Sequence, residues 1–181
     1  MTEPAKPQEW WASLPAVRST LPTISADAVM KLFDDMDLAA TPRSFLLVDV
    51  RRTDWEGGTI KTSLNLPAQS FYQTRKTLFD LLERGGFKMV IFYCGELHFE
   101  GKSDGGNEVK FDTDERALGS SNGRGPRCAA WMQDYIDDVA KFGRKSELKV
   151  FTLAGGIKNW VKEFEGGLVD GFEEKYWEQF K

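Results

Sequence analysis

The sequence has few cysteines and almost no histidine. Its 181 residues include two Cys and one His, which excludes a framework of several disulfides and favours a reduced compartment, the cytoplasm with access to the nucleus. A structural zinc site would need nearly all of these residues, and their spacing fits no common zinc module, so we expect no metal. His98 is the one candidate base for a serine–histidine–aspartate triad.

Long apolar runs and excess positive charge are also missing. No stretch approaches the roughly 20 apolar residues of a membrane span. The N-terminal residues lack the basic start and apolar run of a signal peptide. The net charge is −4, and the absence of a basic stripe argues against a nucleic-acid footprint. We therefore expect neither a membrane nor a nucleic acid as a partner.

What the sequence does contain is enough apolar material for one domain. Hydrophobic residues make up 41% of the chain, with 13 Phe and 6 Trp. Four of the seven prolines precede residue 23, which indicates an irregular arm over residues 1–22 before a domain over residues 23–181. We expect Trp10, Trp11 and Leu14 to attach this arm to the domain.

Apolar runs and helical periods alternate along the domain. We expect strands at 45–48, 89–93 and 149–153, an extended piece at 64–67, and helices at 26–37, 71–84, 126–142 and around Trp160, with a helical tail at 172–180. This alternation predicts an α/β fold with a mostly parallel sheet and helices on both faces. Ligands in such folds bind beyond the carboxyl ends of the strands, where Asp49, Cys94 and Gly155 fall.

Residues 120–126, Ser-Ser-Asn-Gly-Arg-Gly-Pro, lead directly into one predicted helix. Small residues allow successive backbone N–H groups to converge, and the helix N-terminus adds positive charge. Arg124 supplies a charged fork suited to phosphate-like oxygens. A nucleophile is expected at the start of such a loop, yet 29 residues separate Cys94 from Arg124.

Removing residues 96–119 would restore the spacing Cys, five residues, Arg. A loop of that length can surround one tetrahedral anion below a thiolate, and its positive field would favour the thiolate form of Cys94. Cys94 and Arg124 are then the predicted catalytic residues. The predicted oxyanion-binding residues are Gly95, Ser120, Ser121, Asn122, Gly123 and Gly125.

The joined loop resembles that of rhodanese-like domains of the dual-specificity phosphatase and arsenate reductase type. Two further segments agree: residues 49–67, beginning Asp-Val-Arg, and residues 153–160, which contain Leu-Ala-Gly-Gly and Trp160. Apart from the inserted segment, the resemblance covers about residues 44–165. A Cys-five-Arg loop alone would be weak evidence, whereas three signatures in order are strong.

The resemblance implies a three-layer rhodanese-like fold and a cysteine-dependent phosphatase or arsenate reductase. Its substrate would be a phosphorylated compound or arsenate, with no cofactor beyond glutathione or another thiol as reductant for arsenate. Sulfurtransferases of this fold use a loop one residue shorter, so that activity is the disfavoured alternative. A catalytically silent binding module is the other alternative, because residues 96–119 split the loop.

The inserted segment, residues 96–119, carries seven acidic and three basic side chains and the one histidine. Its acidity opposes the electrostatics of an anion-binding loop. One interpretation is a genuine surface insertion, since loop closure entropy grows slowly with length. The other interpretation is a translated intron. Retention of 24 codons keeps the reading frame, and codons for the residues at both junctions can contain the splice donor and acceptor sequences.

Four further residues have assigned roles. Asp49 and Arg51 are expected to form a supporting ion pair at a strand end. Arg127 is interpreted as a surface charge, with a second anion contact as the alternative. Cys128 is interpreted as a small packing residue, with a resolving thiol as the alternative.

Overall fold

The computed structural model describes residues 9–35, 43–95 and 123–180. A five-stranded parallel sheet lies at its centre, in the order β1-β6-β5-β2-β4. The strands are β1 (Thr23–Ile24), β2 (Phe45–Asp49), β4 (Leu64–Asn65), β5 (Met89–Tyr93) and β6 (Lys149–Leu153). Because β5 is the middle strand, its carboxyl end lies between those of β2 and β6.

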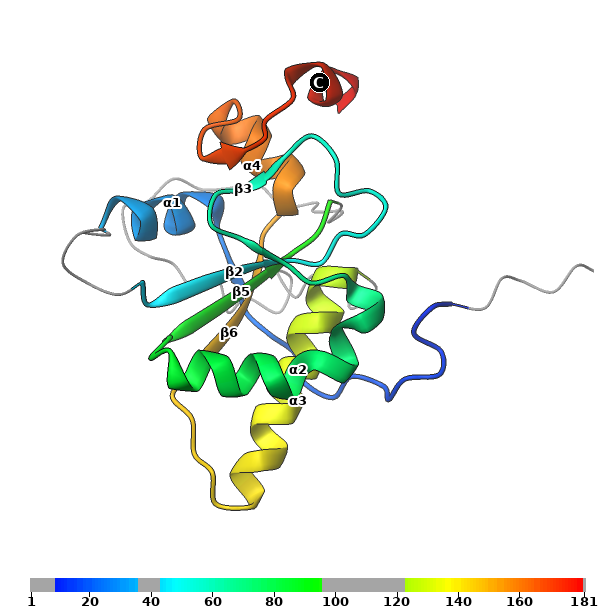
Figure 1. Ribbon diagram of the computed structural model, residues 1–181, viewed down its shortest axis with the longest axis vertical. Coiled ribbons are helices and arrows are strands. Elements are labelled where there is room, and N and C mark those ends of the chain that lie inside the picture. Colours follow the sequence, from blue (N-terminus) through cyan, green and yellow to red (C-terminus); the bar gives the residue numbers. More distant parts are fainter. Residues whose placement is uncertain (1–8, 36–42, 96–122, 181) are drawn as a thin grey trace, which may run out of the picture.

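Helices cover both faces of this sheet (Figure 1). On one face lie α2 (Ala68–Arg84) and α3 (Arg124–Lys141); on the other lie α1 (Ala26–Asp34) and α4 (Gly156–Phe164). The fold is therefore α/β with three layers, and the predicted parallel sheet with helices on both faces is confirmed.

Alternation along the strands divides the core into two. Leu46 and Val48 face the cluster formed with α2 and α3, whereas Phe45 and Leu47 face the cluster formed with α1 and α4. All four are at most 8% exposed, as expected for a strand buried on both faces. Each layer of helices thus has its own apolar contact with the sheet.

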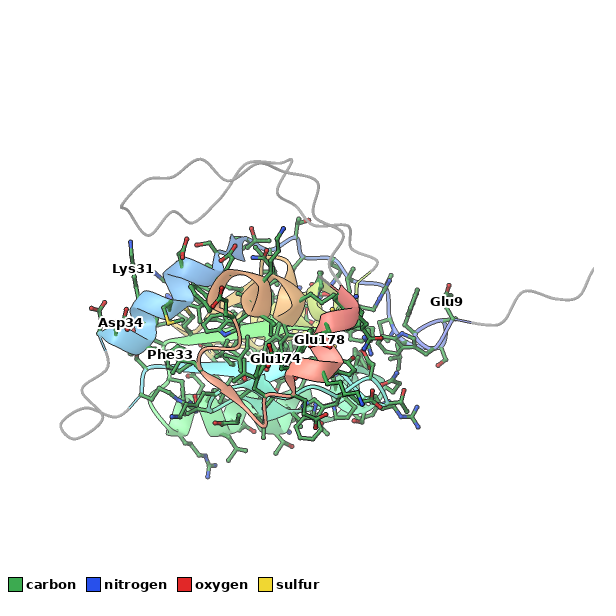
Figure 2. All side chains as sticks on the ribbon, turned by 90° about the horizontal axis from the view of Figure 1, so that it is seen from above. Glu9, Lys31, Phe33, Asp34, Glu174 and Glu178 are labelled. Atoms are coloured by element: carbon green, nitrogen blue, oxygen red, sulfur yellow. The ribbon has the colours of Figure 1, made fainter. Side chains whose placement is uncertain are left out.

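A small second sheet lies beyond the main one. The antiparallel strands β3 (Thr59–Ile60) and β7 (Val169–Asp170) form it, and α5 (Glu174–Trp177) and the 3-10 turn η1 (Glu178–Phe180) follow. On this last segment Glu174 and Glu178 are exposed, as Figure 2 shows from above, whereas Trp177 is only 4% exposed. Its buried indole anchors the C-terminal segment to the domain.

The N-terminal segment packs against the cluster of α2 and α3. Trp10, Trp11 and Leu14 lie against this cluster. The indole nitrogen of Trp131 donates to the carbonyl of Pro15 at 2.9 Å, and the Ser19 hydroxyl donates to Asp134 at 2.6 Å. The first part of the described chain is therefore fixed to α3.

Several element boundaries differ from those expected. Helix α2 begins at Ala68 rather than at residue 71, because Pro67 is its N-cap and a proline is well tolerated at a helix start. Helix α3 begins at Arg124 rather than at residue 126, so Arg124 belongs to the helix itself. The last two residues of the helix expected at 26–37 lie outside the described residues.

Candidate active site

The candidate site lies where β2, β5 and β6 end. Cys94 follows β5 directly and is 1% exposed. Its carbonyl oxygen accepts a hydrogen bond from the backbone N–H of Ile157, at 3.1 Å, in the first turn of α4. Gly156, at φ +59°, lies so close to this carbonyl that a Cβ there would overlap it. The start of α4 therefore holds the backbone of Cys94 in place.

The first turn of α3 approaches Cys94 from the other side. Gly123 is the N-cap of this helix and makes no side-chain capping bond. A Cβ on Gly125 would lie 3.4 Å from the Cα of Tyr93 and 3.6 Å from the backbone nitrogen of Cys94. These are ordinary van der Waals distances, so the positive end of α3 packs directly against the end of β5.

Arg124 forms a two-point ion pair with Asp54. Its Nη1 donates to Asp54 Oδ1 at 2.6 Å, and its Nη2 donates to Asp54 Oδ2. Hydrogen bonding from Arg124 lowers the pKa of Asp54 to about 2. The same hydrogen bonds raise the pKa of Arg124 against the opposing effect of burial, and the charge of Cys94 adds to this increase. Arg124 and Cys94 therefore interact electrostatically despite their separation in the sequence.

Asp54 is a site residue that the sequence did not identify as one. It follows β2, in the loop that leads to β3, and its side chain is 40% exposed. A Cβ on Gly95 would lie 3.5 Å from Asp54 Oδ2 and 3.6 Å from Cδ of Arg51. The loop after β2 therefore meets the residue that follows Cys94.

The predicted ion pair between Asp49 and Arg51 is present and fully buried. Arg51 Nη2 donates to Asp49 Oδ2 at 2.7 Å, with side chains 1% and 0% exposed. Arg51 also donates to the carbonyl of Glu56 at 2.9 Å and to that of Gly58 at 2.6 Å. Its guanidinium thus fixes the loop that carries Asp54.

Tyr93 extends this polar network below the site. Its hydroxyl lies 2.8 Å from both Thr59 Oγ1 and Ser63 Oγ, and it accepts from the backbone N–H of Ile60 at 3.2 Å. Burial raises the pKa of Tyr93 well above its usual range. The phenol is consequently a neutral structural group that connects β5 to the loop after β2.

The start of α3 changes the expectation for Arg127 and agrees with the one for Cys128. Arg127, interpreted as a surface charge, is only 8% exposed, because its guanidinium lies 4.1 Å from the ring centre of Trp11. Its Nε has no hydrogen-bond partner among the residues that the structure describes, and burial lowers the pKa of the side chain. Cys128 is fully buried, and its pKa is raised well above normal by burial and by the charge of Cys94. A protonated, inaccessible thiol fits the packing role better than that of a resolving thiol.

The structure thus brings together five of the predicted site residues, and their chemical role stays a prediction. Cys94, Gly95, Gly123, Arg124 and Gly125 meet at one edge of the sheet. Ser120, Ser121 and Asn122 lie outside the described residues, as do the inserted segment and His98.

Two classes of feature are absent from the described parts of the chain, residues 9–35, 43–95 and 123–180. No helix there is long and apolar enough to cross a bilayer. No three His, Cys, Asp or Glu side chains there form a group that could hold a metal ion.

Comparison with known proteins gives similarity at the level of structure. No family model and no curated protein matches the sequence. Two structures of Saccharomyces cerevisiae Ygr203w are 20% identical to this chain. One describes Ygr203w as a homologue of single-domain rhodanese and of the Cdc25 phosphatase catalytic domain, and the other describes it as a protein tyrosine phosphatase of the rhodanese family. The alignments cover 87% and 88% of this chain and 91% and 99% of Ygr203w, with TM-scores of 0.58 and 0.59. The As-Sb reductase of Leishmania major is 18% identical over 80% of this chain and 79% of its own, with a TM-score of 0.50.

Proposed function

On the premise that the chain has a rhodanese-like fold, which its similarity to Ygr203w shows, we propose that it is a cysteine-dependent phosphatase or arsenate reductase. Cys94 is the nucleophile, and Arg124 with the N-terminal N–H groups of α3 binds the oxyanion. One observation carries this proposal: Cys94 and Arg124 come from distant parts of the sequence, yet the first turn of α3, which begins at Arg124, packs against the backbone of Tyr93 and Cys94 at the carboxyl edge of the sheet.

For a phosphate ester, the Cys94 thiolate attacks phosphorus and the bond from phosphorus to the leaving oxygen breaks. The leaving group takes up a proton, and water then hydrolyses the sulfur–phosphorus bond to release inorganic phosphate and the thiolate. Arg124 and the α3 N–H groups stabilise the negative charge that develops on the equatorial oxygens. No metal or cofactor enters this sequence.

For arsenate, the Cys94 thiolate displaces one oxygen of arsenic, which leaves as water. A second thiol attacks the cysteinyl sulfur, arsenic gains two electrons and departs as arsenite, and the two sulfurs form a disulfide. Cys128 is buried, and its raised pKa makes it a poor second thiol. The electrons would therefore come from glutathione or a similar external thiol, which fits two cysteines that form no disulfide and a cytoplasmic location.

The decisive experiment compares the full chain with a form that lacks residues 96–119. Both are assayed on an aryl phosphate, on arsenate with glutathione, and on thiosulfate with cyanide. We expect the shortened form to act on the aryl phosphate or on arsenate, and Cys94→Ser to abolish that activity. Cys128→Ser, the matched loss of the other thiol, should keep most of it.

Each remaining outcome has a defined meaning. A folded shortened form that is inert in all three assays would overturn the enzymatic proposal and leave a silent binding module. Activity on thiosulfate alone would establish a sulfurtransferase. Sequencing of the transcript tests the origin of residues 96–119: abundant message that retains those codons, without a shorter form, would exclude a translated intron.

A further inference from the structure

The ion pair between Arg124 and Asp54 uses only one edge of the guanidinium. A guanidinium carries five N–H donors in one plane. Asp54 accepts from Nη1 and Nη2, and therefore binds the edge of the guanidinium formed by its two terminal nitrogens. The edge formed by Nε–H and one remaining terminal N–H can still donate to a second oxyanion in two places. A carboxylate and a tetrahedral anion can thus bind Arg124 at the same time.

The position of Asp54 is itself fixed by buried groups. The backbone N–H of Arg52 donates to Asp54 Oδ1 at 3.1 Å. The adjacent carbonyl of Glu56 accepts from Arg51, and that of Gly57 accepts from the Trp177 indole at 2.6 Å. Buried donors hold the loop from the sheet side and from the C-terminal side. Asp54 therefore presents its carboxylate from a well-supported backbone, although the carboxylate itself is partly exposed.

Arg124 benefits from such support because an arginine side chain has many rotamers. Its side chain is 24% exposed, and an anchor removes part of that rotamer freedom before a ligand binds. A ligand that meets a pre-oriented guanidinium does not have to order it on binding. The carboxylate also adds negative charge near an anionic ligand, which opposes binding. The two effects have opposite signs, so an experiment can separate them.

We propose that Asp54 is a positioning residue that holds the Arg124 guanidinium in place for an oxyanion above Cys94. This inference rests on the proposed function, because it concerns the same site. The loop after β2 then contributes to anion binding by orienting the Arg124 guanidinium, which the loop from Cys94 to Arg124 does not do alone. The buried pair of Asp49 and Arg51 then affects the site indirectly, because Arg51 holds the loop that carries Asp54.

The test measures equilibrium binding of inorganic phosphate, arsenate and tungstate to the full chain in a Cys94→Ser background, where no turnover occurs. We expect Asp54→Asn to weaken binding by roughly tenfold, a change that corresponds to about 1.4 kcal/mol. Asp54→Glu should recover part of the loss, because it restores the charged acceptor. Asp138→Asn removes a carboxylate that pairs with Arg18 on the surface of α3, and should leave binding unchanged.

Three results would count against the proposal, and they differ in what they overturn. Equal binding by the Asp54→Asn variant, with unchanged stability in urea, would overturn the positioning role alone. Tighter binding by that variant would also overturn it and make Asp54 an internal competitor for Arg124. Failure of both the full chain and the form that lacks residues 96–119, each with Asp54 intact, to bind any of the three anions would overturn the proposed function together with this inference.

Discussion

A Cβ on Gly156 would overlap the carbonyl oxygen of Cys94, so the two residues touch backbone to backbone. The contact ties the end of β5 to the start of α4. The neighbouring N–H of Ile157 donates to the same carbonyl at 3.1 Å. The position of Cys94 is therefore set by a glycine that lies about sixty residues later in the chain, at the start of the helix that follows the adjacent strand β6.

Substitution of Gly156 should disturb this contact. A side chain at φ +59° costs about 1–2 kcal/mol of backbone strain, and the overlap with Cys94 adds to that cost. We expect Gly156→Ala to lower the free energy of unfolding by at least about 2 kcal/mol more than Gly86→Ala. Gly86 is a matched control, because it has φ +72° but open space around it. Equal losses in urea unfolding would show that the contact is unimportant.

Loss of Asp49 would leave the Arg51 charge buried without its carboxylate. Removal of one partner of a buried ion pair costs about 3–5 kcal/mol, and we expect Asp49→Ala to fall in this range. An exposed pair provides the comparison: Lys88 and Glu147 are 66% and 87% exposed, so Glu147→Ala should cost less than about 1 kcal/mol. Urea unfolding at pH 7 measures both. Similar values for the two variants would contradict the structural role of the pair.

The pair of Asp54 and Arg124 should give a small acid-dependent stability. Because the pKa of Asp54 is lowered to about 2 in the folded chain, its contribution is present above about pH 4 and is lost as pH falls through about 2. Partial exposure and screening keep this contribution below about 1 kcal/mol. The stability difference between the unmodified chain and Asp54→Asn should shrink between pH 4 and pH 2. A difference that stays constant over this range would argue against the pair.

Cys128 should resist alkylation while the chain is folded. It is fully buried, and its raised pKa keeps the thiol protonated. At pH 8, we expect iodoacetamide to leave Cys128 unmodified in the native chain and to modify it in urea, as read by peptide mass spectrometry. Rapid modification of Cys128 in the native chain would restore the resolving-thiol interpretation.

The sequence predicts the parts of the fold whose patterns are long enough to be read. The strand 89–93 is an uninterrupted apolar run, the strand 149–153 has three apolar residues in five, and β5 and β6 coincide with them. By contrast, β1, β3 and β7 have two residues each, too few to show any period. They exist because neighbouring strands supply their hydrogen-bond partners, which is tertiary information.

The candidate site is only partly predictable for the same reason. Cys94 and Arg124 follow from a strand end and a loop motif that are visible in the chain. Asp54 does not, because its partner lies 70 residues away on another element. Arg127 resembles any charged residue in a helix until Trp11 of the N-terminal segment is seen to cover it. Interactions between distant segments have no local signature.

The central place of β5 in the sheet has a consequence for how this chain can change. Both of its neighbours pair with it along its length, and Cys94 leaves the sheet only after that pairing ends. Chain added or removed between Gly95 and Gly123 therefore leaves every strand register untouched. The residues that would carry the proposed chemistry and the residues that pair the strands are therefore different sets, so a change in one loop can alter the first without altering the second.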